Sequence, residues 1–162
     1  MFTLDKVQYD DKKSFYEMML KQLSSLLEGE TDSIANLSNT SALLRELLDE
    51  INWVGFYLLK DDELVLGPFQ GKVACVRIKN GRGVCGTAAL EDKTQVVVDV
   101  HTFPGHIACD SASKSEIVIP MHKGEKVIGV LDIDSPIKGR FDELDACYLE
   151  KLVKILEESC EW

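Results

Sequence analysis

Two β-forming runs near the C-terminal end most constrain how this chain can fold. Residues 116–121 and 126–133 are rich in isoleucine, valine and leucine, and the Lys-Gly pair between them is typical of a tight turn. They predict an antiparallel hairpin. Because side chains alternate between the two faces of a strand, Asp132 and Asp134 lie on the same face. Glu116, at the start of the partner strand, can reach the same region.

Carboxylates on one sheet face among apolar neighbours are costly unless they meet cations or a ligand. A cluster of Glu116, Asp132 and Asp134 suits binding of a ligand's ammonium group, and one acid with a raised pKa could donate a proton. The alternative is that the aspartate pair only ends the strand before the Ser-Pro turn. The pattern alone leaves both interpretations open.

The rest of the chain predicts helices at both ends and short strands in the middle. Apolar residues at three- and four-residue spacing indicate helices over 12–28, from Thr31 to Ile51, and over 142–158. Strand candidates lie at 53–59, 64–66, 73–78 and 95–98, with a short helix at 85–91. We therefore predict an α+β domain with a mainly antiparallel sheet and helices packed on one face.

The formal net charge of −10 bears on the partners. Nucleic-acid binding needs basic surface to neutralise phosphates, so we expect none. No stretch approaches the roughly 20 apolar residues that span a bilayer, so we expect no membrane association. The charged N-terminus lacks the apolar core of a secretory signal, which favours the cytoplasm. A small-molecule or protein partner fits best.

Five cysteines are an odd and high number for 162 residues. A structural disulfide framework is not expected in a reducing compartment, and no CxxC pair indicates a zinc site. Cys109 is the best nucleophile candidate, because it lies in the irregular stretch 101–114 and loops often hold reactive groups. The alternative is a half-buried loop cysteine. Cys147, near the apolar stripe of the last helix, is expected to be a small buried hydrophobe.

Two other sequence patterns are weaker evidence for a functional site. His101, His106 and Cys109, with Asp99, could be imagined as metal ligands, but their spacing is loose and no second cluster completes the set, so we predict no metal. The glycine-rich run 81–86 matches neither the dinucleotide fingerprint nor the phosphate-loop pattern, and indicates turn geometry.

Six motifs, in order, carry a resemblance to a known family: NWVGFY (52–57), GPFQG (67–71), GVCG (83–86), FPGHIACD (103–110), SEIV (115–118) and LDIDS (131–135). Their order and the spacing of three cysteines resemble the free methionine-(R)-sulfoxide reductases, which are single GAF-domain enzymes. The resemblance implies one GAF domain over 1–162. Its N-terminal helices would span about 12–50, its sheet and active-site loops about 52–135, and its C-terminal helix about 142–158.

The resemblance also implies residue roles. Cys109 matches the catalytic cysteine that attacks the sulfoxide, Cys75 matches the resolving cysteine, and Cys85 matches a third family cysteine that could be an alternative resolver. The sulfenic acid left on the first cysteine would condense with a second thiol to give a disulfide. An external dithiol such as thioredoxin would reduce that disulfide, with no cofactor.

The implied substrate is free methionine sulfoxide. The acidic residues that hold its amino group and assist oxygen protonation are matched by Glu116, Asp132 and Asp134, while Trp53 and Tyr57 are expected to wall the methyl-sulfoxide end. The chief alternative is a GAF domain that binds a ligand or senses redox state without turnover, followed by a structural dimerisation domain. Under either interpretation the chain could form a homodimer.

Overall fold

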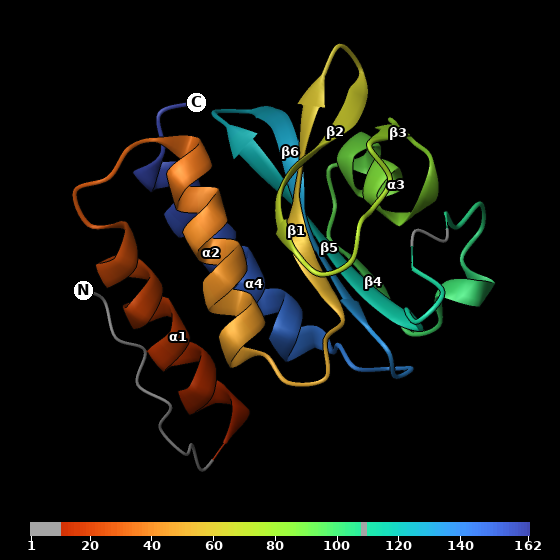
Figure 1. Ribbon diagram of the computed structural model, residues 1–162, viewed down its shortest axis with the longest axis horizontal. Coiled ribbons are helices and arrows are strands. Elements are labelled where there is room, and N and C mark those ends of the chain that lie inside the picture. Colours follow the sequence, from red (N-terminus) through yellow and green to blue (C-terminus); the bar gives the residue numbers. More distant parts are fainter. Residues whose placement is uncertain (1–10, 108–109) are drawn as a thin grey trace.

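The structure, a computed structural model, describes residues 11–107 and 110–162. Its centre is a six-stranded antiparallel sheet in the order β3-β2-β1-β6-β5-β4 (Figure 1). The strands are β1 (Trp53–Lys60), β2 (Glu63–Gln70), β3 (Arg77–Lys79), β4 (Gln95–Val97), β5 (Ser115–Lys123) and β6 (Lys126–Ser135). The predicted α+β fold with an antiparallel sheet is confirmed.

Two long helices, α2 (Ser33–Leu47) and α4 (Glu143–Ser159), cover one face of the sheet, and α1 (Lys12–Leu27) packs against these two helices. Each begins at an aspartate, Asp11, Asp32 or Asp142, whose side chain accepts a hydrogen bond from a first-turn N–H group. The shorter α3 (Gly83–Glu91) lies on the opposite face (Figure 1). None of the described helices is long and apolar enough to span a bilayer.

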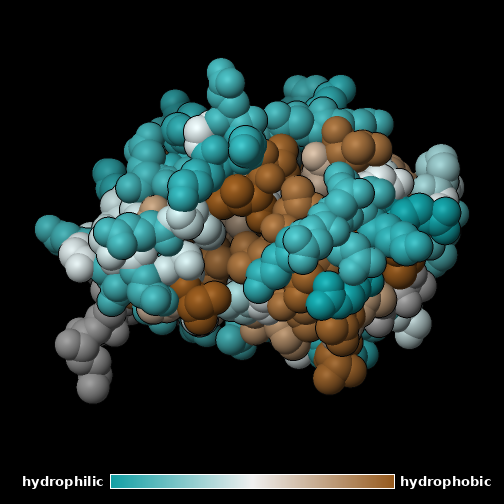
Figure 2. Space-filling view, turned by 90° about the horizontal axis from the view of Figure 1, so that it is seen from above, coloured by the Kyte–Doolittle hydropathy of each residue, from teal (hydrophilic) through white to brown (hydrophobic). Residues whose placement is uncertain are grey.

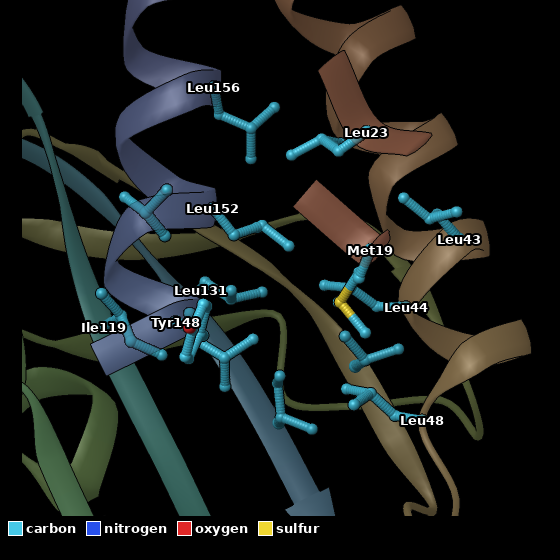
Figure 3. Packing of buried hydrophobic residues seen from close by; sticks show 14 of the residues in the cluster. Met19, Leu23, Leu43, Leu44, Leu48, Ile119, Leu131, Tyr148, Leu152 and Leu156 are labelled. Carbon is cyan, nitrogen blue, oxygen red and sulfur yellow. The ribbon is translucent and has the colours of Figure 1, made fainter. Parts of the chain in front are cut away.

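Strand alternation sorts the central side chains between the two faces. Phe56 of β1, Ile119 of β5 and Leu131 of β6 point into the core shared with α1, α2 and α4. Figure 3 shows Ile119 and Leu131 beside Tyr148 and Leu152 of α4. All of these are almost fully buried, and burial of one such side chain contributes about 1.5–3 kcal/mol. This core fixes which side of each central strand faces away from the helices.

The predicted hairpin is present, with Gly124 at a positive φ of 62° in its turn. Its register places Glu116 of β5 opposite Asp134 of β6, and β1 places Gly55 opposite Asp132. Because Leu131 and Ile133 of β6 and Ile117 of β5 face the long helices, the acids that alternate with them project from the α3 face. The hairpin therefore fixes the position of the acidic cluster.

Two expectations were wrong. Only the end of the predicted strand 73–78 is a strand, because β1 side chains bind the preceding loop. Trp53 Nε1 donates to the Lys72 carbonyl at 3.1 Å, and Tyr57 Oη donates to the Cys75 carbonyl at 3.0 Å. Cys147 is exposed rather than buried, since it lies beside the apolar stripe of α4.

Candidate active site

A cavity on the α3 face gathers most of the residues that the sequence singled out. Its lining includes Trp53, Tyr57, Cys85, Glu116, Asp132 and Asp134. Cys75 packs against a second apolar cluster, which includes Trp53, Tyr57 and Cys85, and it follows Ala74, which lines the cavity. Cys109 lies outside the described residues. The predicted acidic and aromatic residues therefore share one site.

The carboxyl groups of this cavity are held in an environment that favours their protonated forms. Glu116 and Asp132 each expose only 6% of their surface. Burial, then repulsion from Asp132 and Asp134, raises the pKa of Glu116 well above its usual value. Burial likewise raises the pKa of Asp132 to about 6, although hydrogen bonds from Cys85 and Glu116 oppose this, and it raises that of Asp134. Burial and mutual repulsion therefore both disfavour simultaneous ionisation of these three neighbouring carboxyls.

Cys85 lies in the first turn of α3, directly against the acids. Its Sγ is 3.8 Å from Glu116 Oε1, and the residue is 3% exposed. A helix N-terminus ordinarily lowers a thiol pKa, but burial and the nearby Asp132 and Glu116 carboxyls raise the pKa of Cys85 well above its usual value. The neutral thiol is therefore the favoured form.

Glycines allow α3 to approach the sheet this closely. A Cβ on Gly86 would lie 2.5 Å from the Lys79 carbonyl oxygen, and Gly83 has a φ of 62°. The glycine-rich run therefore provides turn and packing geometry, as expected. Its effect is to bring Cys85 over β5 and β6.

Two aromatic side chains from β1 form a wall beside the acids. The rings of Trp53 and Tyr57 stack with centroids 5.9 Å apart, and the Phe69 ring also stacks with Trp53 at 5.3 Å. Gly55 between them leaves room for this stack, since a Cβ there would lie 2.7 Å from the Trp53 ring. The same two side chains hold the 71–76 loop through its carbonyl groups, so one pair of aromatics both walls the cavity and places Cys75.

The cysteines near the cavity are in different states. Cys75 is disulfide-bonded, whereas Cys85 carries a free thiol, as do Cys147 and Cys160.

The loop of Cys75 also presents apolar surface, because Val73 and Val76 are 88% and 67% exposed. In the view from above, hydrophobic residues gather between hydrophilic residues on either side (Figure 2).

Sequence reasoning missed a polar group that supports the cavity. Asn52 Nδ2 donates to Asp110 Oδ2 at 3.2 Å and to Ser113 Oγ at 3.0 Å, and Lys72 Nζ is 3.5 Å from Asp110 Oδ1. These contacts connect the start of β1 with the segment before β5. The signal was available in the motif NWVGFY, whose asparagine received no role.

The histidines considered as metal ligands have other contacts. His101 Nδ1 bonds to Asp99 Oδ1 at 2.8 Å, and Lys138 Nζ lies 2.5 Å from Asp99 Oδ2. His106 lines the cavity instead. In the part of the chain that the structure describes, the one group of potential ligand side chains close enough to share an ion is Cys85, Glu116 and Asp132.

Comparison with known proteins places the chain in a family. The GAF domain model matches residues 22–159. The chain is 57% identical to the free methionine-R-sulfoxide reductase of Escherichia coli over 148 residues, covering 91% of this chain and 90% of the relative. It matches the structure of the Neisseria meningitidis free methionine-R-sulfoxide reductase in complex with its substrate with a TM-score of 0.94 and 50% identity, covering 98% of this chain and 95% of that one.

A second solved structure, the reduced form of fRMsr of Staphylococcus aureus, gives a TM-score of 0.87 at 62% identity, covering 89% of this chain and 94% of that one. These matches extend over the helices, the sheet and the cavity. The chain therefore belongs to the GAF domain family and, within it, to the free methionine-(R)-sulfoxide reductases.

Proposed function

We propose that this chain reduces free L-methionine (R)-sulfoxide to L-methionine. The observation that carries the proposal is the buried group of three carboxyls, Glu116, Asp132 and Asp134, facing an aromatic wall in one cavity. The Neisseria relative, which is similar over nearly the whole chain, has been solved with its substrate. A sensor or structural domain would leave this costly buried acidity without a role.

The acids explain why the substrate should be the free amino acid. A free ammonium group can pair with the Asp132 and Asp134 carboxylates, whereas the amide nitrogen of a peptide carries no charge. An uncharged substrate would leave buried carboxyls without a partner, which discriminates strongly against it. Trp53 and Tyr57 supply an apolar surface for the methyl-sulfoxide end.

In the proposed chemistry, the Cys109 thiolate attacks the sulfoxide sulfur and takes over its oxygen as a sulfenic acid, while methionine leaves. Glu116, whose pKa is raised, supplies the proton that the departing oxygen needs. A second thiol then displaces this oxygen as water and forms a disulfide. Two electrons thus pass from the two thiols to the sulfoxide.

We assign the second thiol to Cys75 rather than Cys85. Cys75 is disulfide-bonded in this structure, while Cys85 is a free thiol whose pKa is raised. Reduction of the disulfide requires an external dithiol, for which thioredoxin is our proposal. The exposed Val73 and Val76 beside Cys75 offer apolar contact to such a partner.

The test is methionine production from resolved R and S sulfoxides with dithiothreitol, using free and N-acetylated amino acids. We expect turnover of the free R isomer and little of the other three compounds. Equal reduction of the N-acetylated R sulfoxide would refute ammonium recognition by the acids. Replacing dithiothreitol by thioredoxin, thioredoxin reductase and NADPH tests the recycling partner separately.

A further inference from the structure

Cys85, Glu116 and Asp132 bring one sulfur and two carboxylate groups together from three elements. We propose that these residues form a binding site for a thiophilic divalent cation, with Zn²⁺ as the best-matched ion. Cys85 comes from α3, Glu116 from β5 and Asp132 from β6, and one ligand atom of each lies within 4.8 Å of the others.

The separations suit tetrahedral zinc. With Zn–S near 2.3 Å and Zn–O near 2.1 Å, tetrahedral angles place sulfur about 3.6 Å from an oxygen ligand and two oxygen ligands about 3.4 Å apart. Cys85 Sγ already lies 3.8 Å from Glu116 Oε1. Small side-chain rotations therefore complete three ligand positions. Asp134, which lines the same cavity, or water can fill the fourth.

A second observation points to a missing partner at this place. Asp132 Oδ1 is buried and finds no hydrogen-bond partner among the described residues, and the whole residue is only 6% exposed. Of the described lysines and arginines, none forms an ion pair with Glu116, Asp132 or Asp134. A cation in the cavity would give this oxygen a partner and neutralise the buried charge.

The ligand set also selects among cations. Carboxylates alone would suit Mg²⁺ or Ca²⁺, whereas a thiolate favours Zn²⁺ and other soft ions. Cys85 is free while Cys75 is disulfide-bonded, so the site is complete in the oxidised protein. Metal binding is thus separable from the redox cycle.

One consequence rests on the proposed function. If the same carboxyls hold the substrate ammonium, Zn²⁺ and free methionine exclude each other from the cavity. Zinc would then act as a competitive inhibitor of the reductase at a site built for an amino acid. Zinc binding itself needs no methionine sulfoxide, so it can be measured whether or not turnover occurs.

The experiment is calorimetric titration of chelator-treated, oxidised full-length protein with zinc chloride alone. We expect one zinc ion per chain, and the same in a Cys147→Ser/Cys160→Ser variant, which removes the two other free thiols. Cys85→Ser and Asp132→Asn should each weaken binding by at least about 100-fold, the upper end of what loss of an outer-shell partner costs. Circular dichroism identifies a variant that fails to fold. If Cys85→Ser fails to fold, the zinc affinity of Asp132→Asn, which preserves side-chain shape, decides whether the site binds zinc.

Cobalt gives a readout specific to sulfur. Co²⁺ bound here should show a thiolate charge-transfer band that is lost in Cys85→Ser and kept in Cys147→Ser/Cys160→Ser. The absence of stoichiometric zinc binding, or binding unaffected by both pocket substitutions, overturns the site. Addition of L-methionine should weaken zinc binding; if it does not, the shared-cavity inference falls even when turnover of the sulfoxide is intact.

Discussion

The hydrogen bond from Tyr57 to the Cys75 loop gives the sharpest test of how this cavity is organised. Tyr57→Phe keeps the ring that walls the cavity and removes the hydroxyl that donates to the Cys75 carbonyl at 3.0 Å. One neutral hydrogen bond contributes about 0.5–1.5 kcal/mol, which corresponds to roughly a 2- to 12-fold change in the population of the bonded loop position. We expect disulfide formation to slow by that factor and the first methionine to form at the wild-type rate.

Single-turnover quench experiments without reductant separate the two events. Methionine released per chain measures the first step, which also consumes one thiol as the sulfenic acid, and loss of a second free thiol per chain measures the second step. Tyr148→Phe is a matched control, because it removes a hydroxyl on α4 whose 3.4 Å contact with Glu17 is far from the cavity. If Tyr57→Phe slows both steps equally, the hydroxyl acts on the substrate and not on the loop; if it slows neither, the bond does not position Cys75.

Three further predictions concern the nucleophile, the acids and a distant histidine. Cys109→Ser should abolish methionine formation with an unchanged circular dichroism spectrum; retained turnover would move the nucleophile elsewhere. Glu116→Gln should lower kcat/KM for the free sulfoxide by about 10²-fold or more, as expected for loss of a general acid, and wild-type kcat/KM would contradict that role. Burial lowers the pKa of His122, but its hydrogen bonds to Asp92 and Glu157 outweigh this and raise it. The stabilisation from protonated His122 is therefore complete below the ordinary histidine pKa and is lost as pH rises through the raised pKa. We expect His122→Gln to lower the unfolding free energy more at about pH 5 than at about pH 9. An equal loss at both pH values would contradict this link between protonation and stability.

The sequence predicted those parts of the site that depend on short-range periodicity. A strand repeat of two places Asp132 and Asp134 on one face, and the apolar Leu131 decides which face that is. The long helices followed equally from the three- and four-residue spacing of their apolar residues. The shared face of Asp132 and Asp134 was therefore predictable from the sequence, although the pattern left open whether the pair binds a ligand or only ends the strand.

What the sequence could not predict depends on contacts between distant segments. The run 73–78 has strand composition, yet Tyr57 binds the Cys75 carbonyl within it and Trp53 binds the carbonyl of Lys72 just before it. The distance from Cys85 to the acids depends on α3 packing through Gly86 against the Lys79 backbone. Such packing overrides local propensity.

The carboxyls of the cavity also decide how the two neighbouring thiols differ. Cys85 lies at a helix N-terminus, where a thiolate would normally be stabilised, but burial against Glu116 and Asp132 favours its protonated form. Ionisation of a thiol this close to Glu116 and Asp132 would add a negative charge beside carboxyl groups that are themselves buried. This difference supports the proposed assignment of Cys75 as the resolving thiol, since hydrogen bonds from Trp53 and Tyr57, and not the carboxyls, hold its loop.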